Sequence, residues 1–168
     1  ADRLALYVSS VFDAPMNYPG LASIMALGFY SVQIYCDFSG YSDIAIGTAK
    51  LFGINLMRNF NLPYFSRDIA EFWRRWHMTL GGWFRDYVYI PMGGNRVNKP
   101  RWFFNLLTVW FLTGLWHGAG WNFIIWGLFF GVFLIIEKGF WRKTERKSSL
   151  LMKMTGHICV IIAIVISF

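Results

Sequence analysis

The stretch Thr113-Gly-Leu-Trp-His-Gly-Ala119 places one histidine, His117, at the end of a run that is otherwise apolar enough for a lipid bilayer. The run before it, Trp102 to Trp116, carries no charged side chain, and a second apolar run, Trp121 to Ile136, follows closely. Ionisable residues are costly at membrane depth and are usually functional there. The pattern therefore predicts a helical hairpin with His117 near its turn, and makes His117 the first candidate for chemistry.

The composition also favours a membrane protein. Of the 168 residues, 56% are hydrophobic and 15% are charged, whereas soluble domains average about 45–50% apolar and about 25% charged residues. The net charge of +7 could indicate nucleic-acid binding. However, basic residues gather between apolar runs, at 96–101 and 142–147, which is typical of cytoplasmic loops. We therefore expect a lipid bilayer, and no nucleic acid, as the partner of this chain.

The predicted fold is all-α: a multi-pass transmembrane helical bundle with re-entrant or interfacial amphipathic helices. Because the chain starts without methionine and ends within an apolar run, we expect residues 1–168 to be an internal fragment of one domain. Residues 21–36 are predicted to form a membrane helix. The polar segment Asp37 to Asp43 should interrupt it, since unpaired polar groups are costly in lipid. Residues 44–57 should then form a re-entrant or interfacial segment. Residues 1–18 are predicted to be a loop or the tail of a helix.

An amphipathic helix is predicted over about residues 67–83, with Ser66 as its N-cap. Its apolar face repeats at helical spacing, and its other face is charged, with Glu71 and Arg75 in the favourable i,i+4 order. His77 falls at the edge of the apolar face, where it could simply contact water or headgroups. Such a helix lies in the interface or lines a polar cavity.

The remaining polar residues leave several interpretations open. Arg74 and Arg75 could bind phosphate, carboxylate or thioester-cofactor groups, or anchor the helix on anionic lipid. Asp37 and Asp43 could coordinate a cation, orient a histidine or line a pore, but we prefer a polar turn paired with arginines of the amphipathic helix. His157 is interpreted as structural.

The known signatures of several other site types are missing from the sequence. The three scattered histidines do not have the spacing of a metal site. Cys36 and Cys159 stand alone in apolar surroundings and predict neither zinc nor a disulfide. No GxSxG or GxGxxG motif is present. Direct group transfer assisted by a general base, for which a neutral imidazole is suited, therefore fits better than a covalent enzyme intermediate.

Five motifs along residues 31–138 resemble the membrane-bound O-acyltransferase family. They are Asp37-Phe-Ser-Gly-Tyr-Ser-Asp43, Asn59-Phe-Asn-Leu-Pro-Tyr64, Phe72-Trp-Arg-Arg-Trp-His-Met-Thr-Leu80, Trp83-Phe-Arg-Asp-Tyr-Val-Tyr-Ile-Pro-Met-Gly-Gly-Asn-Arg96 and Gly114-Leu-Trp-His-Gly-Ala119. The motif containing Pro91 to Arg96 is similar to the branch of alginate O-acetyltransferase membrane subunits. A related branch transfers D-alanine to teichoic acid. Where the alginate-like branch usually has a further histidine, this chain has Phe130.

The resemblance implies a helical membrane bundle around a tunnel, in a multi-pass protein of the bacterial inner membrane. His117 matches the family's characteristic histidine, and His77 matches its upstream polar partner. The implied reaction moves an acyl group, which is acetyl in the alginate-like branch, from a cytoplasmic thioester donor such as acetyl-CoA, with no bound cofactor. The implied partners are a periplasmic or extracellular acetyltransferase and an acceptor polysaccharide.

We therefore expect an O-acyltransferase in which His117 acts as the general base or as a relay nucleophile. His77 would orient His117 or stabilise the charged transition state, and Arg74 and Arg75 would contact the acyl donor. The alternatives are D-alanyl transfer to teichoic acid, a transporter in which Asp37, Asp43 and His117 line a polar path, and a purely structural subunit.

Overall fold

The computed structural model describes residues 1–138 and 150–167, and every regular element among them is helical. The elements are, in chain order, α1 (Asp2–Asp13), η1 (Pro15–Asn17), α2 (Gly20–Leu51), η2 (Pro63–Phe65), α3 (Ile69–Arg75), α4 (Met78–Phe84), η3 (Arg85–Tyr89), α5 (Lys99–His117), α6 (Trp121–Ile136) and α7 (Leu150–Ser167). The all-α prediction is therefore confirmed for the described residues. The basic run 142–147 lies outside them.

The long helix α2 corrects two predictions. It passes through Asp37 and Asp43 without a break and continues to Leu51, so the polar segment neither ends the helix nor starts a separate one. A helix satisfies its own backbone hydrogen bonds whatever its side chains are, and this segment contains no proline. Both carboxylates are exposed, and the ion pairs within the described residues are Arg75–Glu71 and Arg85–Asp86. The predicted pairing of Asp37 and Asp43 with arginines is therefore wrong.

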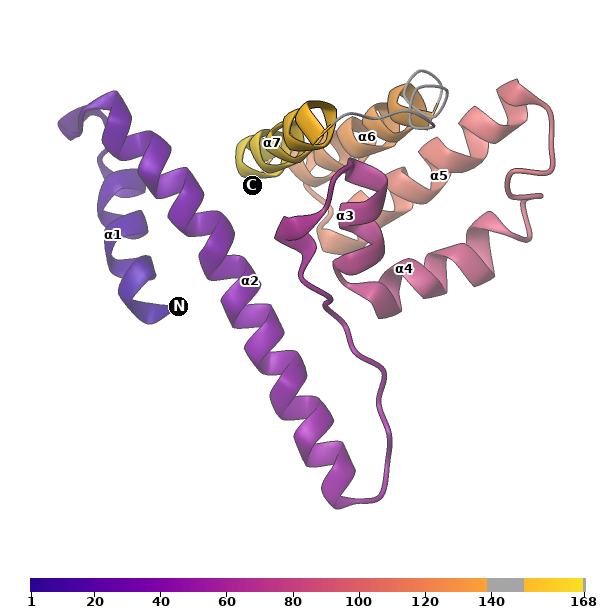
Figure 1. Ribbon diagram of the computed structural model, residues 1–168, viewed down its shortest axis with the longest axis horizontal. Helices are drawn as coiled ribbons and strands as arrows, with labels where there is room; N and C mark the ends of the chain where they lie inside the picture. Colours follow the sequence, from indigo (N-terminus) through magenta and orange to yellow (C-terminus); the bar gives the residue numbers. More distant parts are fainter. Residues whose placement is uncertain (139–149, 168) are drawn as a thin grey trace.

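The N-terminal region and the membrane spans also differ from expectation in part. Residues 2–13 form a helix of their own, α1, which lies along the first half of α2 (Figure 1) and contacts it through Tyr7 and Phe29. Among the described residues, α2 is the helix that is both long and apolar enough to cross a membrane. Trp121–Ile136 and Gly156–Val165 are apolar but shorter. The multi-pass arrangement remains a prediction.

The predicted hairpin is confirmed: α5 and α6 lie side by side and antiparallel (Figure 1), joined by a short turn after His117. Glycines allow this close approach. A Cβ atom on Gly127 would collide with the carbonyl oxygen of Trp110, and one on Gly114 would collide with that of Phe123. Small residues that bring helix backbones together are typical of membrane helix pairs. Gly114 therefore allows the close packing of α5 against α6.

The predicted helix over residues 67–83 is in fact two helices, α3 and α4, broken at Trp76 and His77. Trp76 has extended backbone angles and His77 is left-handed, with φ 45°. The segment Asn59–Asn61 supplies hydrogen bonds that the break would otherwise lose: the Met78 N–H donates to the Asn59 carbonyl, and the Asn61 N–H donates to the Arg75 carbonyl. Tertiary pairing thus replaces helical pairing at this point.

The N-cap of α3 is Asp68 and not Ser66. The Asp68 carboxylate accepts the Glu71 N–H, whereas the buried Ser66 hydroxyl donates to the Pro63 carbonyl at 2.6 Å. Helix α7 packs on this region, because the Nδ1 of His157 is 2.8 Å from the Ser66 carbonyl oxygen. That contact supports the structural interpretation of His157.

The largest core of the described residues joins α3, α5, α6 and α7, with aromatic rings at its centre. Phe72 and Phe130 are fully buried. Trp73 lies edge-to-face with Trp110 and Phe130, with ring centroids 4.8 Å apart in both pairs. Phe130 is therefore a core residue. The core fixes α3 against the α5–α6 hairpin and so fixes the helix before His77 relative to the helix that ends at His117.

Candidate active site

His77 and His117 line one cavity of about 520 Å³. The cavity runs along one face of α5, on which Leu106, Val109, Thr113 and His117 follow one another at helical spacing. Leu106 and His117 are eleven positions apart in sequence, which corresponds to roughly 16 Å of helix. The cavity is therefore an elongated trough with the two histidines toward one end, and we call it the histidine trough.

Among the described residues, His117 has a hydrogen-bond partner for its Nδ1 atom and none for Nε2. Its Nδ1 lies 2.8 Å from the Thr113 carbonyl oxygen. A carbonyl only accepts hydrogen bonds, so Nδ1 carries the proton and Nε2 of the neutral ring keeps its lone pair. The ring packs against Trp116 and Trp126, with centroids 4.9 Å away in both cases. His117 is exposed in the described part of the chain.

His77 has the opposite tautomer. It is the N-cap of α4, and its Nδ1 accepts the Leu80 N–H at 3.3 Å. Nδ1 is therefore unprotonated in the neutral ring, and Nε2 carries the proton. The ring is held between Phe38, at a centroid distance of 4.7 Å, and Trp116, at 5.8 Å. A left-handed residue other than glycine is uncommon, and such strain concentrates at functional sites.

The environment of His77 favours its neutral form. His77 lies between α3 and α4, outside the candidate spanning helix α2. Burial lowers its pKa below the ordinary value of 6.5 and the nearby His117 lowers it further, while a backbone contact of His77 itself opposes this in part. The trough thus holds one imidazole with a free lone pair and one with a free N–H. Together they could remove a proton and stabilise a developing negative charge.

The structure separates the two arginines that the sequence grouped together. Arg74 lines the histidine trough. Arg75 does not line it, and its guanidinium pairs instead with Glu71 at 2.6 Å and contacts the Asn61 carbonyl at 3.4 Å. Arg74 is therefore placed for contact with a ligand in the trough, whereas Arg75 is engaged along its own helix.

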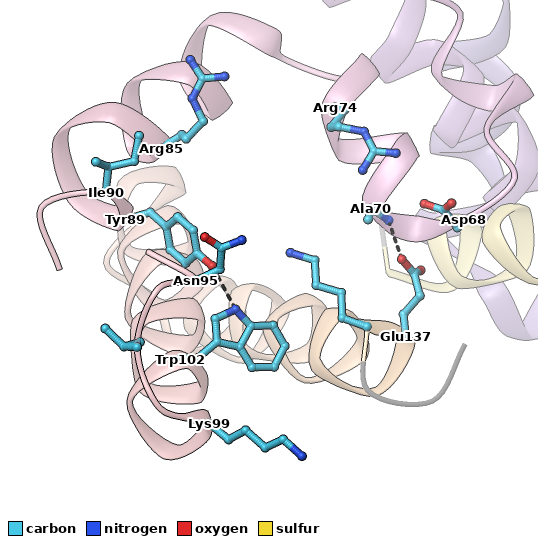
Figure 2. A pocket seen from close by; sticks show the side chains of 12 residues that line it. Asp68, Ala70, Arg74, Arg85, Tyr89, Ile90, Asn95, Lys99, Trp102 and Glu137 are labelled. Atoms are coloured by element: carbon cyan, nitrogen blue, oxygen red, sulfur yellow. Dashed lines mark hydrogen bonds between the residues drawn. The ribbon is translucent and has the colours of Figure 1, made fainter. Parts of the chain in front are cut away.

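A second cavity, of about 800 Å³, adjoins the trough at the end away from the hairpin turn. We call it the polar cavity. Figure 2 shows Arg74, Asp68 and Glu137 on one side of it and Arg85, Tyr89 and Trp102 on the other. Four basic residues and two acidic residues line it, namely Arg74, Arg85, Lys99, Lys138, Asp68 and Glu137. The two cavities share the lining residues Ala70, Arg74, Arg85, Tyr89 and Lys138.

The wall of the polar cavity is tied together by several contacts. The Trp102 indole N–H donates to the Tyr89 hydroxyl at 2.9 Å (Figure 2). Lys138, after α6, lies 5.9 Å from the ring centroid of Trp102, near the start of α5. The open ends of the hairpin therefore meet at this cavity. Within the described residues, no cluster of His, Cys, Asp and Glu has the arrangement of a metal site.

Sequence reasoning missed Glu137, which it treated only as the end of an apolar run. Its two carboxylate oxygens accept the N–H group of Ile69, at 2.7 Å, and that of Ala70, at 3.1 Å (Figure 2). These donors lie 68 and 67 positions away in the sequence. A carboxylate just after an apolar helix was the available signal, but nothing local indicates its partner.

The chain is similar in sequence to known O-acyltransferases. The family model of membrane-bound O-acyltransferases matches residues 8–168. A probable alginate O-acetylase, AlgI, of Azotobacter vinelandii is 49% identical over 138 residues, which cover 82% of this chain and 28% of that protein. A peptidoglycan O-acetyltransferase of Helicobacter pylori is 44% identical over 146 residues, covering 87% of this chain and 28% of that protein.

A more distant relative is the teichoic acid D-alanyltransferase of Streptococcus thermophilus, 38% identical over 140 residues, which cover 77% of this chain and 32% of that protein. The chain thus spans less than a third of the length of these relatives. The family match covers nearly the whole chain and includes both histidines and both cavities. The chain belongs to the membrane-bound O-acyltransferase family.

Proposed function

We propose that the protein containing this chain is a membrane O-acyltransferase in which His117 is the general base. It would move an acyl group, most simply acetyl, from a cytoplasmic thioester donor toward a polysaccharide or glycan acceptor. The observation that carries the proposal is the pair of opposite tautomers in one trough: a free lone pair on His117 and a free N–H on His77.

The two adjoining cavities suit a thioester donor. The polar cavity has an excess of positive side chains, which suits the phosphates of acetyl-CoA or of a carrier-protein prosthetic group. The narrower trough leads from there past Arg74 to the two histidines, and would take the uncharged arm that bears the thioester. Arg74 lines both cavities and is our candidate for donor binding, while Arg75 would act indirectly.

The reaction follows from the two tautomers. His117 Nε2 takes the proton of an acceptor hydroxyl while the hydroxyl oxygen attacks the thioester carbonyl carbon. The oxyanion that forms accepts a hydrogen bond from the Nε2–H of His77, in a preorganised arrangement of the kind that stabilises such intermediates. The carbon–sulfur bond then breaks, and the thiolate takes the proton from His117, which returns to its starting state.

Acetyl transfer is favoured over D-alanyl transfer by the relatives. The acetyl-transferring relatives are 49% and 44% identical to the chain, and the D-alanyl relative is 38% identical. By analogy we place the protein in the bacterial inner membrane, as a multi-pass protein. There it would hand the acetyl group to a periplasmic or extracellular acetyltransferase that modifies the polysaccharide.

The test is a His117→Ala replacement in the full-length protein, expressed in its own cells. We expect base-releasable acetate on the cell-surface or exported polysaccharide to be lost, while the amount of protein in the membrane fraction stays at the parent level. Parent levels of acetylation in a strain that expresses the variant normally would refute the proposed role. Solute flux through purified protein in liposomes, without thioester consumption, would point to a transporter instead.

A further inference from the structure

Glu137 spans two parts of the site that are far apart in the sequence. It follows α6, in the hairpin that carries His117, and its carboxylate holds the first two N–H groups of α3. Those amides have no partner within their own helix, because the first turn of any helix leaves its donors unpaired. The side chain therefore joins the hairpin to the helix that carries Arg74 and leads into His77.

A carboxylate at position 137 is electrostatically unfavourable unless a specific contact requires its two oxygens. Burial raises the pKa of Glu137, and the neighbouring Asp68 raises it further, against the lowering effects of the two amides and of Lys138. A glutamine would avoid the charge but has one acceptor oxygen, and its amide group would face an N–H group. A carboxylate offers a separate acceptor oxygen to each N–H group, as Glu137 does here, so the bidentate contact accounts for a half-buried charge next to another acid.

The contact fixes the direction of α3. Ile69 and Phe72 bury one side of α3 in the core, which sets its distance from the hairpin. The two hydrogen bonds that Glu137 accepts also fix the position of α3 along its axis and its rotation about that axis. Figure 2 shows Glu137 beneath the start of α3, with Arg74 one turn further on, above the polar cavity. A shift of α3 would move Arg74 relative to that cavity and the Trp76–His77 break relative to His117.

We propose that Glu137 is a positioning residue: its bidentate contact with the Ile69 and Ala70 amides aligns Arg74 and His77 with the hairpin that carries His117. This inference rests on the proposed acyl-transfer function for its kinetic consequence, but the contact itself can be tested without any activity. Glu137 does not touch the reacting atoms in this scheme.

The experiment uses full-length protein in detergent, as parent, Glu137→Gln and Glu137→Ala. Asp13→Asn serves as the matched loss of an exposed carboxylate. Hydrogen exchange of the peptide covering residues 68–76 should be faster in both Glu137 variants and unchanged in Asp13→Asn. With acetyl-CoA as the donor, kcat/KM per folded molecule should fall about 10- to 100-fold, the order expected for a small misplacement of groups around a reaction.

A double-mutant cycle separates positioning from simple destabilisation. If Glu137 acts by aligning Arg74, the rise in donor KM caused by Glu137→Gln should largely disappear in an Arg74→Ala background, since the effects of residues coupled through a shared backbone shift are not additive. Equal effects in both backgrounds would overturn the proposal, as would unchanged exchange of residues 68–76. Faster exchange with parent kinetics would confirm the contact but overturn its positioning role. Failure of the acyl-transfer function itself would be visible separately, as a parent protein that consumes no thioester.

Discussion

At the scale of single residues, the two histidines gain their roles from the partners of their Nδ1 atoms. His117 donates to the carbonyl of Thr113, and His77 accepts from the amide of Leu80. Each backbone partner fixes one tautomer and leaves Nε2 for a substrate. In the proposed mechanism one ring would be the base and the other a hydrogen-bond donor, although the residues are chemically identical.

His77→Asn should separate catalysis from folding. Asparagine tolerates the left-handed backbone of position 77 and is a good N-cap, so α4 should begin as before. Its side chain is too short to place an N–H where His77 Nε2 lies. We expect kcat to fall about 10²–10³-fold, as when one oxyanion donor is removed, with little change in the melting temperature. A folded variant with parent kcat would contradict the assigned role of His77.

The lowered pKa of His77 predicts a dependence of stability on pH. Below the ordinary value of 6.5, the unfolded imidazole binds a proton that the folded one does not. The free energy of unfolding therefore decreases as the pH falls from 6.5 toward the lower folded pKa, and this contribution then levels off. His77→Asn should show a smaller fall in melting temperature between about pH 7.5 and about pH 5.5 than the parent. Identical falls would show that His77 does not contribute.

At the scale of elements, the α5–α6 hairpin depends on glycines that have no room for a side chain. Gly127→Ala would press a methyl group against the Trp110 carbonyl and the Gly114 backbone, and overpacking of this kind costs about 1–3 kcal/mol. We expect a lower melting temperature for detergent-solubilised protein, followed by tryptophan fluorescence.

The matched control is Gly47→Ala in α2, where an added Cβ meets nothing within 4 Å among the described residues. Alanine is a better helix former than glycine by up to about 1 kcal/mol, so this variant should be as stable as the parent or more so. If Gly127→Ala were equally well tolerated, the close approach of α5 and α6 would not be a source of stability.

Elements with a strong periodic pattern could be predicted from the sequence, and elements decided by distant contacts could not. The hairpin follows from two apolar runs and a polar turn. The break at Trp76 and His77 has no local signal, because neither proline nor glycine is present there and the hydrogen bonds that compensate for it come from Asn59 and Asn61. The sequence pattern does not predict the continuity of α2 through Asp37 and Asp43. Polar side chains suggest a break in an apolar helix, but the backbone hydrogen bonds of the helix do not depend on them.

Part of the candidate site could likewise be predicted from the sequence, and part could not. His117 and Arg74 could be selected because charge and imidazole are unusual in such an apolar chain. The tautomers could not, since they depend on which backbone group each Nδ1 meets. Nor could the difference between Arg74 and Arg75, because the ion pair with Glu71 and the rotation of α3 decide which guanidinium reaches the trough.

At the scale of the whole molecule, the described helices line a polar cavity at the open end of the hairpin, and the histidine trough leads from it along α5 to His77 and His117. In the proposed reaction, the charged part of the donor and its reactive end would have separate surroundings, and the acyl carbon would lie away from the basic end of the hairpin.

Arg74→Ala should therefore weaken binding of the donor more than it slows the chemical step. We expect the KM for acetyl-CoA to rise about tenfold, equivalent to about 1.4 kcal/mol of binding free energy, with kcat reduced far less. Arg75→Ala should change the KM less, because Arg75 lies outside both cavities. Equal effects of the two substitutions would argue against the polar cavity as the donor site.

The central claim is that His117 is the base for acyl transfer. It is tested most directly by the rate at which purified full-length protein consumes acetyl-CoA in the presence of its acceptor, for the parent, His117→Ala and His157→Ala. His157 is the matched control, because it is a histidine whose observed contact joins α7 to Ser66. We expect the rate of acetyl-CoA consumption to fall at least about 10²-fold for His117→Ala, which is the lower range for general-base catalysis. The rate for His157→Ala should stay near that of the parent. A folded His117→Ala protein that works at the parent rate would contradict the central claim.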